Sequence, residues 1–243
     1  PHIYGFTNDM DKILKICKKN KLLLIEDAAE MIGQNYKEKP CGSFGDLSIF
    51  SFYANKHITT GEGGAIFTNN KRIYEKCKNL RNLNFGSNNR FNHEELGWNY
   101  RYTNMQAALG LNQLKRIDEI IKKKREIGNY FYNNLKNNNN IIVQKPSLSY
   151  CKNVYWIFGI IIKNSNKKNT QKIQKKLLSM GIQTRDFFWP MNKQKIYKKM
   201  GLFKGQNFPI AEYLANNGFY IPSGLGLKKS EMVKICKCIN KIL

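Results

Sequence analysis

Apolar residues recur along the first half of the chain with two kinds of spacing, and these predict alternating helices and strands. Every third or fourth residue between 10 and 17 is apolar, which predicts a helix that Asn8 caps. The continuous apolar run from Leu22 to Ile25 is typical of a strand buried on both faces. Further strands are predicted at 47–53 and 65–68, and a helix at 72–80.

The order of elements changes in the second half. One long helical pattern starts at Thr103 and continues, more weakly, to Leu135. Strands are then predicted at 141–143, 155–162 and 183–188, with a helix at 170–180 and a last helix capped by Ser230. This order predicts an α/β domain at residues 1–125, followed by a small α+β domain at residues 126–243.

Composition favours a soluble globular protein, because 42% of the residues are hydrophobic and 24% are charged. The longest apolar run, at 155–162, is far too short to span a membrane, and the first residues are neither basic nor continuously apolar. The six cysteines lack the paired spacing of a metal site. We therefore expect a reduced, cytoplasmic protein with no metal and no membrane association.

The formal net charge of +24 could indicate nucleic acid or an anionic surface as a partner. However, 34 of the 41 basic residues are Lys, and the chain is also rich in Asn and Ile, a combination that AT-rich coding produces without a ligand. Proteins that read nucleic acids usually concentrate Arg and aromatic residues in one motif. We expect no specific nucleic-acid partner, although such a charge would favour a phosphate-bearing substrate.

Three candidate functional residues lie at or near the ends of predicted strands. Asp27 follows the first strand, Ser51 lies within the second, and Lys56 comes before a glycine-rich segment at 61–64. A partly buried Lys can become a neutral nucleophile, a carboxylate can hold a pyridinium proton, and a hydroxyl can bind phosphate. Each residue alone has an ordinary structural explanation, and the glycines match neither the Walker nor the dinucleotide pattern. The residues alone are suggestive and no more.

Several short segments together resemble the DegT/DnrJ/EryC1/StrS family of sugar aminotransferases, especially its perosamine-type 4-aminotransferases. The resemblance is strong to about residue 125 and looser beyond it. The segments are PHIYG at 1–5, IEDAAE at 25–30, GSFGD at 42–46, FSF at 50–52, NK at 55–56, TTGEGG at 59–64, GWNYRYTN at 97–104 and QAA at 106–108.

The resemblance implies fold type I of the pyridoxal-phosphate-dependent transferases, as in aspartate aminotransferase, with a large domain built on a mostly parallel sheet and a small α+β domain. It implies pyridoxal 5'-phosphate as cofactor. Lys56 matches the lysine that binds the cofactor covalently and moves protons, and Asp27 matches the acid that faces the pyridine nitrogen. The remaining matches are Ala29 and Glu30 beside the ring, Ser51 at the phosphate, and Asn99, which reaches the phosphate across a homodimer interface with shared active sites.

The implied reaction is transfer of an amino group, from glutamate, to a nucleotide-linked 4-keto-6-deoxysugar. Alternatives are amination of a 3-keto sugar, a non-catalytic remnant, and a basic nucleic-acid-binding protein on the same fold. Trp189 and Asn192 stand where perosamine-type enzymes tend to have His, which leaves the sugar contacts and any role of Arg185 open. Family members begin well before the match at Pro1, so we expect an upstream segment with further cofactor contacts.

Overall fold

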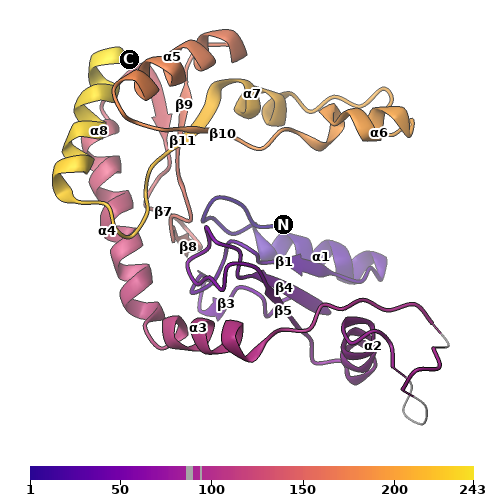
Figure 1. Cartoon of the computed structure of the whole chain (residues 1–243). Coiled ribbons are helices and arrows are strands. Elements are labelled where there is room, and N and C mark those ends of the chain that lie inside the picture. The colour runs from indigo at the N-terminus through magenta and orange to yellow at the C-terminus, as the bar shows by residue number, and fades with distance from the viewer. Residues whose placement is uncertain (86–89, 94) are drawn as a thin grey trace. The chain divides into compact units, whose positions relative to one another are not determined.

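A computed structural model describes residues 1–85, 90–93 and 95–243, which form two compact units (Figure 1). Unit 1 contains Pro1–Lys122 and Ser147–Trp156, and unit 2 contains Lys123–Pro146 and Ile157–Leu243. The sequence-based boundary at residue 125 lies close to the first division. It differs in that the segment Ser147–Trp156 belongs to unit 1.

Backbone hydrogen bonds hold this returning segment in unit 1. The Lys37 amide donates to the Tyr150 carbonyl at 2.6 Å, and the Val154 amide donates to the Gly5 carbonyl at 3.3 Å. Gly5 has a φ of +94°, and a Cβ on it would lie 2.8 Å from the Tyr155 nitrogen, so this approach requires glycine. Contacts between residues so far apart in the sequence leave no periodic signal.

Unit 1 is built on a three-stranded sheet of order β1-β4-β5, formed by β1 (Ile25–Asp27), β4 (Leu47–Ser51) and β5 (Gly64–Phe67). β1 and β4 are parallel, and β4 and β5 are antiparallel. The carboxyl ends of β1 and β4 therefore lie at the same edge of the sheet. The other elements of unit 1 are α1 (Met10–Asn20), α2 (Lys71–Arg81), α3 (Asn104–Leu114), the hairpin β2 (Asn35–Tyr36) with β3 (Lys39–Pro40), and the hairpin β7 (Ser147–Leu148) with β8 (Cys151–Lys152).

Three local predictions in unit 1 need correction. Asp9, not Asn8, caps α1, because the Asp9 carboxylate accepts from the Lys12 amide. The first strand begins at Ile25, and the preceding Leu22 and Leu23 are exposed, since no described residue covers them. The long helix is two helices, α3 and α4 (Ile117–Leu135). Apolar residues continue at helical spacing across the break, so periodicity could not reveal it.

Unit 2 is an antiparallel sheet of order β10-β11-β9-β6, formed by β6 (Ile141–Val143), β9 (Phe158–Ile162), β10 (Arg185–Asp186) and β11 (Gly218–Ile221). Sequence analysis missed the inner strand β11, which follows α7 with no residue between them, so no loop separates the two patterns. Helices α5 (Lys167–Ser179), α7 (Pro209–Asn217) and α8 (Lys229–Ile242) accompany the sheet, and η1 (Met191–Lys193) and α6 (Lys195–Lys199) lie between β10 and α7. Lys228, not Ser230, is the N-cap residue of α8, and its amide donates to the Glu231 side chain.

The core of unit 2 joins its long helix to its sheet. Phe131 of α4 and Phe158 of β9 are fully buried, with ring centroids 5.2 Å apart. Ile160 and Phe219 are also fully buried on neighbouring strands. Burial of each such side chain contributes roughly 1.5–3 kcal/mol. No helix among the described residues is long and apolar enough to span a membrane.

Candidate functional site

The sheet of unit 1 brings two of the predicted site residues to one edge. Asp27 ends β1 and pairs with Ile49 of the parallel strand β4, and Ser51 ends β4 two residues later. The Ser51 hydroxyl accepts from the Tyr53 amide at 3.2 Å. Lys56 lies in the loop that follows β4, and its amide donates to the Tyr53 carbonyl at 3.0 Å. Asp27, Ser51 and Lys56 therefore belong to one end of one sheet.

The Lys56 amine lies between a carboxylate and an aromatic ring. Its Nζ is 4.0 Å from Glu30 Oε1 and 4.2 Å from the centre of the Trp156 ring. The side chains of Lys56 and Glu30 are only 11% and 8% exposed. The Trp156 indole is held in turn, because its Nε1 donates to the Asn55 carbonyl at 2.9 Å and its ring stacks on Tyr4.

Burial is the main cause of the pKa shifts of Lys56 and Glu30. It lowers the pKa of Lys56, whereas the nearby carboxylates of Glu30 and Asp27 act in the opposite direction. Burial also raises the pKa of Glu30 to about 7, against the effects of a hydrogen bond from the Tyr4 amide and the charge of Lys56. Asp27 raises the Glu30 pKa further by like-charge repulsion. The site therefore holds an amine and a carboxyl group that both ionise less readily than in water.

Backbone amides orient the two carboxylates. The Tyr4 amide donates to Glu30 Oε2 at 2.6 Å, and the Ala29 amide donates to Asp27 Oδ1 at 3.1 Å. The predicted residues Asp27, Ala29, Glu30 and Lys56 thus form one connected group. Tyr4 and Trp156 are site residues that sequence analysis missed, because nothing in the spacing connects either of them with Lys56.

Asn99 does not join this group within the part of the chain that the structure describes. It forms an isolated bridge with Asn82, and its side-chain oxygen accepts from Arg101 Nε at 2.8 Å. Asn99 is exposed, so its predicted reach across a dimer interface stays a prediction.

The loop after Lys56 is anchored to α3. The Gln113 side chain accepts from the Thr59 amide at 3.1 Å and donates to the Thr59 carbonyl at 2.7 Å. The Thr59 hydroxyl in turn accepts from the Gly61 amide. Gly61 has a φ of +79°, which explains the glycine at this turn. These contacts fix the loop that carries Lys56.

A second buried polar cluster includes Glu26, the middle residue of β1. His2, Glu26 and Cys41 place their ligand-type atoms within 4.8 Å of one another, and among the described residues only they are grouped as a metal ion would require. Burial opposes ionisation of Glu26, but hydrogen bonds from His2, Gly42 and Phe44 keep its pKa below the ordinary value. Burial raises the pKa of Cys41 to about 12, so its thiol is protonated. We interpret the cluster as a hydrogen-bonded structural network.

A cavity of unit 1 lies on the opposite face of β4 from Ser51. It measures about 720 Å³. Phe50 and Phe52, which flank Ser51 in the sequence, line it. Because successive side chains along a strand point to opposite faces, Ser51 points away from the cavity. Most of its lining is apolar. The lining residues are Met31, Ile32, Gly33, Gln34, Asn35, Pro40, Cys41, Phe50, Phe52, Ile58, Phe67, Tyr102, Ala107, Gly110, Leu111, Leu114 and Asp118.

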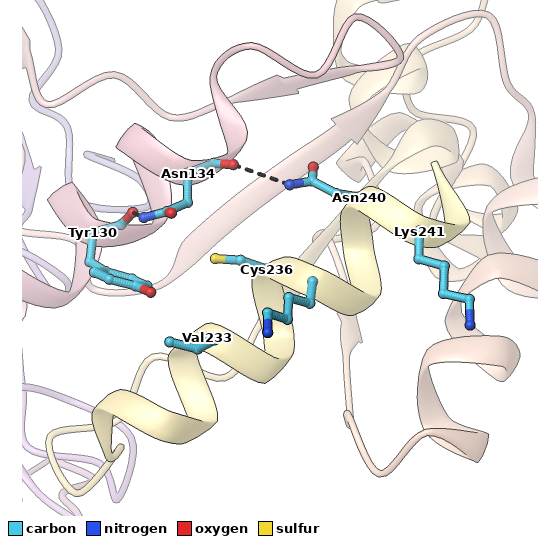
Figure 2. Close-up of a pocket in the computed structure, with 7 residues that line it drawn as sticks. Tyr130, Asn134, Val233, Cys236, Asn240 and Lys241 are labelled. Carbon is cyan, nitrogen blue, oxygen red and sulfur yellow. Dashed lines mark hydrogen bonds between the residues drawn. The ribbon is translucent and has the colours of Figure 1, made fainter.

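Unit 2 contains a groove of about 430 Å³ between α4 and α8 (Figure 2). Asn240 closes one end by donating to the Asn134 carbonyl at 3.3 Å, and the Cys236 side chain points between the helices. Burial raises the pKa of Cys236 to about 11. The lining residues are Tyr130, Asn134, Val233, Cys236, Lys237, Asn240 and Lys241. This set pairs no acid with a base, so it does not suggest catalysis.

Comparison with known proteins gives consistent matches over nearly the whole chain. The model of the DegT/DnrJ/EryC1/StrS aminotransferase family matches residues 1–240. The chain is 37% identical over 240 residues to a GDP-perosamine synthase of Escherichia coli O157:H7, covering 99% of this chain and 64% of that protein. It is 28% identical to a putative pyridoxal phosphate-dependent aminotransferase of Bacillus subtilis, covering 98% of this chain and 61% of the relative.

A solved structure agrees with these matches. The aminotransferase PseC of Helicobacter pylori, involved in the biosynthesis of pseudoaminic acid, superposes with a TM-score of 0.91 at 27% identity. The match covers 98% of this chain and 64% of that one. This similarity confirms the predicted fold class. The chain therefore spans less than two thirds of the length of these relatives.

Proposed function

The chain belongs to the DegT/DnrJ/EryC1/StrS aminotransferase family, as its motifs predicted, and on this premise we propose that it acts as a pyridoxal-phosphate-dependent sugar aminotransferase. The observation that carries the proposal is the group around Lys56. A partly buried amine, whose pKa is lowered by burial, lies beside two carboxyl groups at the end of a sheet. Such an amine is a suitable nucleophile toward an aldehyde.

The described residues fit pyridoxal phosphate by the chemistry of their donors. Lys56 offers the amine for covalent attachment, Asp27 offers a carboxylate for the pyridine nitrogen, and the hydroxyl of Ser51 can donate to a phosphate oxygen. Ala29 and Glu30 are proposed to lie beside the ring. Asn99 is proposed to contact the phosphate of a second subunit in a homodimer.

The bound cofactor would supply an electron sink for the carbon that gains or loses the amino group. Lys56 Nζ would bind it and later carry protons to and from that carbon. The carboxylate of Asp27 would keep a proton at the pyridine nitrogen, and the Ala29 amide would hold that carboxylate in place. Trp156 and Tyr4 would shield the amine from water.

The proposed substrate is a nucleotide-linked 4-keto-6-deoxysugar, and the proposed amino donor is glutamate. The support is the 37% identity to a GDP-perosamine synthase. The net charge of +24 would attract a diphosphate-bearing substrate at low ionic strength.

Incubation with a panel of nucleotide 4-keto and 3-keto deoxysugars and glutamate, followed by mass spectrometry, tests this proposal. We expect amination of a 4-keto sugar and conversion of glutamate to its keto acid. Amination of a 3-keto sugar alone would transfer the assignment to the alternative within the family. The Lys56→Ala variant is the control and should form no product.

A further inference from the structure

One oxygen of the Glu30 carboxyl group accepts a hydrogen bond, and the other faces the amine of Lys56. Oε2 accepts the Tyr4 amide at 2.6 Å, whereas Oε1 lies 4.0 Å from Lys56 Nζ. Both side chains are nearly inaccessible to solvent. The two groups therefore form a buried ion pair that is longer than a hydrogen bond, with the Glu30 carboxyl held in orientation by the backbone.

The Trp156 ring covers a second side of the Lys56 amine. Its ring face lies 4.2 Å from Lys56 Nζ and is fixed by the hydrogen bond to Asn55 and the stack on Tyr4. Tyr4 thus contacts both neighbours of the amine, through its backbone amide on Glu30 and its ring on Trp156. An aromatic face favours the charged ammonium form of Lys56, in the same direction as the Glu30 carboxylate.

The charged groups that face Glu30 are Lys56 and Asp27. Asp27 repels a negative charge on Glu30, and burial acts in the same direction. Burial also disfavours the charged form of Lys56. Burial therefore favours the neutral forms of both groups, Lys–NH₂ and Glu–COOH, more than it would for an exposed Lys and Glu.

We propose that Glu30 controls the protonation of Lys56: its ionised carboxylate holds the proton on the neighbouring ammonium group, and loss of that negative charge favours the neutral amine that can attack an aldehyde. Transfer of the proton within the pair, from Lys–NH₃⁺ and Glu–COO⁻ to Lys–NH₂ and Glu–COOH, leaves the total charge unchanged. Glu30 thereby sets the fraction of Lys56 that is nucleophilic. This inference deepens the proposed function but concerns a property of the cofactor-free protein.

Competitive trace acetylation of the cofactor-free protein with acetic anhydride tests it, because an amine reacts with this reagent only in its neutral form. Peptide mass spectrometry reports the labelling of Lys56 as a function of pH, with the exposed Lys175 of α5 as internal reference. In Glu30→Gln, the Tyr4 amide keeps an oxygen acceptor, but the negative charge is lost. We expect the Lys56 labelling curve to shift to lower pH and its labelling at pH 7 to rise several-fold.

Two further variants make the result decisive. Glu30→Asp keeps a carboxylate and should restore part of the shift, and Glu38→Gln, which changes an exposed carboxylate, should leave the curve at its original position. An unchanged Lys56 curve in a folded Glu30→Gln protein, judged by circular dichroism, would overturn the inference. Because acetylation needs neither cofactor nor substrate, failure here is distinguishable from failure of the proposed transaminase activity.

Discussion

Lys56 Nζ lies 4.2 Å from the centre of the Trp156 ring, although the two residues are far apart in the sequence. The segment that carries Trp156 returns to unit 1 from beyond α4 and ends there. The lysine that the family resemblance singled out thus depends on a residue that the resemblance did not include.

Replacing Trp156 should therefore destabilise unit 1. The ring is almost fully buried, so Trp156→Ala is expected to cost about 3–5 kcal/mol. Trp156→Phe keeps an aromatic face but loses the hydrogen bond to Asn55, which should cost about 1 kcal/mol in addition to the effect of the smaller ring. Denaturant unfolding of both variants measures the difference. Equal costs would show that the indole hydrogen bond, not the ring, holds this contact.

Asp27→Asn should leave the cofactor bound but reduce turnover by at least about 100-fold. The reason is that an amide cannot keep the pyridine nitrogen protonated, whereas it can still accept from the Ala29 amide. Absorbance of the bound cofactor and steady-state rates provide the two readouts. Asp186→Asn, an exposed change in unit 2, is the control. Near-normal turnover in Asp27→Asn would mean that another carboxylate serves the ring.

The pKa of about 7 for Glu30 predicts a specific pH dependence of stability. The folded pKa lies above the ordinary value of 4.5, so the folded state retains a proton that the unfolded chain has lost. This contribution is fully present below pH 4.5 and disappears as the pH rises through about 7, and it amounts to roughly 3 kcal/mol at most. Glu30→Gln should thus gain stability relative to the parent between pH 5 and pH 8. A constant difference in unfolding midpoint across that range would contradict the assignment.

Sequence patterns predicted the elements around the site better than the site itself. β4, β5 and α2 have strong local signals and were found close to their observed bounds. The pairing of Asp27 with Lys56 came from family motifs, since neither residue is distinctive alone. The roles of Tyr4 and Trp156 depend on contacts between distant segments, which no periodicity encodes. The predicted burial of the first strand was wrong because burial depends on what packs against a strand, not on its composition.

The exposed apolar residues in and before β1 should promote self-association of the protein. Leu23 is 83% exposed and Ile25 is 65% exposed, next to the equally apolar Leu22. Contiguous apolar surface of this kind promotes association. Leu22→Ser combined with Leu23→Ser should lower the binding of a hydrophobic dye and reduce self-association in sedimentation velocity. Leu178→Ser, an exposed leucine on α5, should change neither, and an equal effect of that control would show that the β1 surface is not special.

The most direct test of the proposed function is to find which lysine binds pyridoxal phosphate. The protein is mixed with the cofactor, reduced with borohydride, digested and mapped by mass spectrometry. The structure predicts modification at Lys56, because burial lowers the pKa of its amine, whereas most of the other lysines are exposed. Lys56→Ala should lose the modified peptide and the associated absorbance. Specific reduction onto a different lysine, with Lys56 unmodified, would contradict the account.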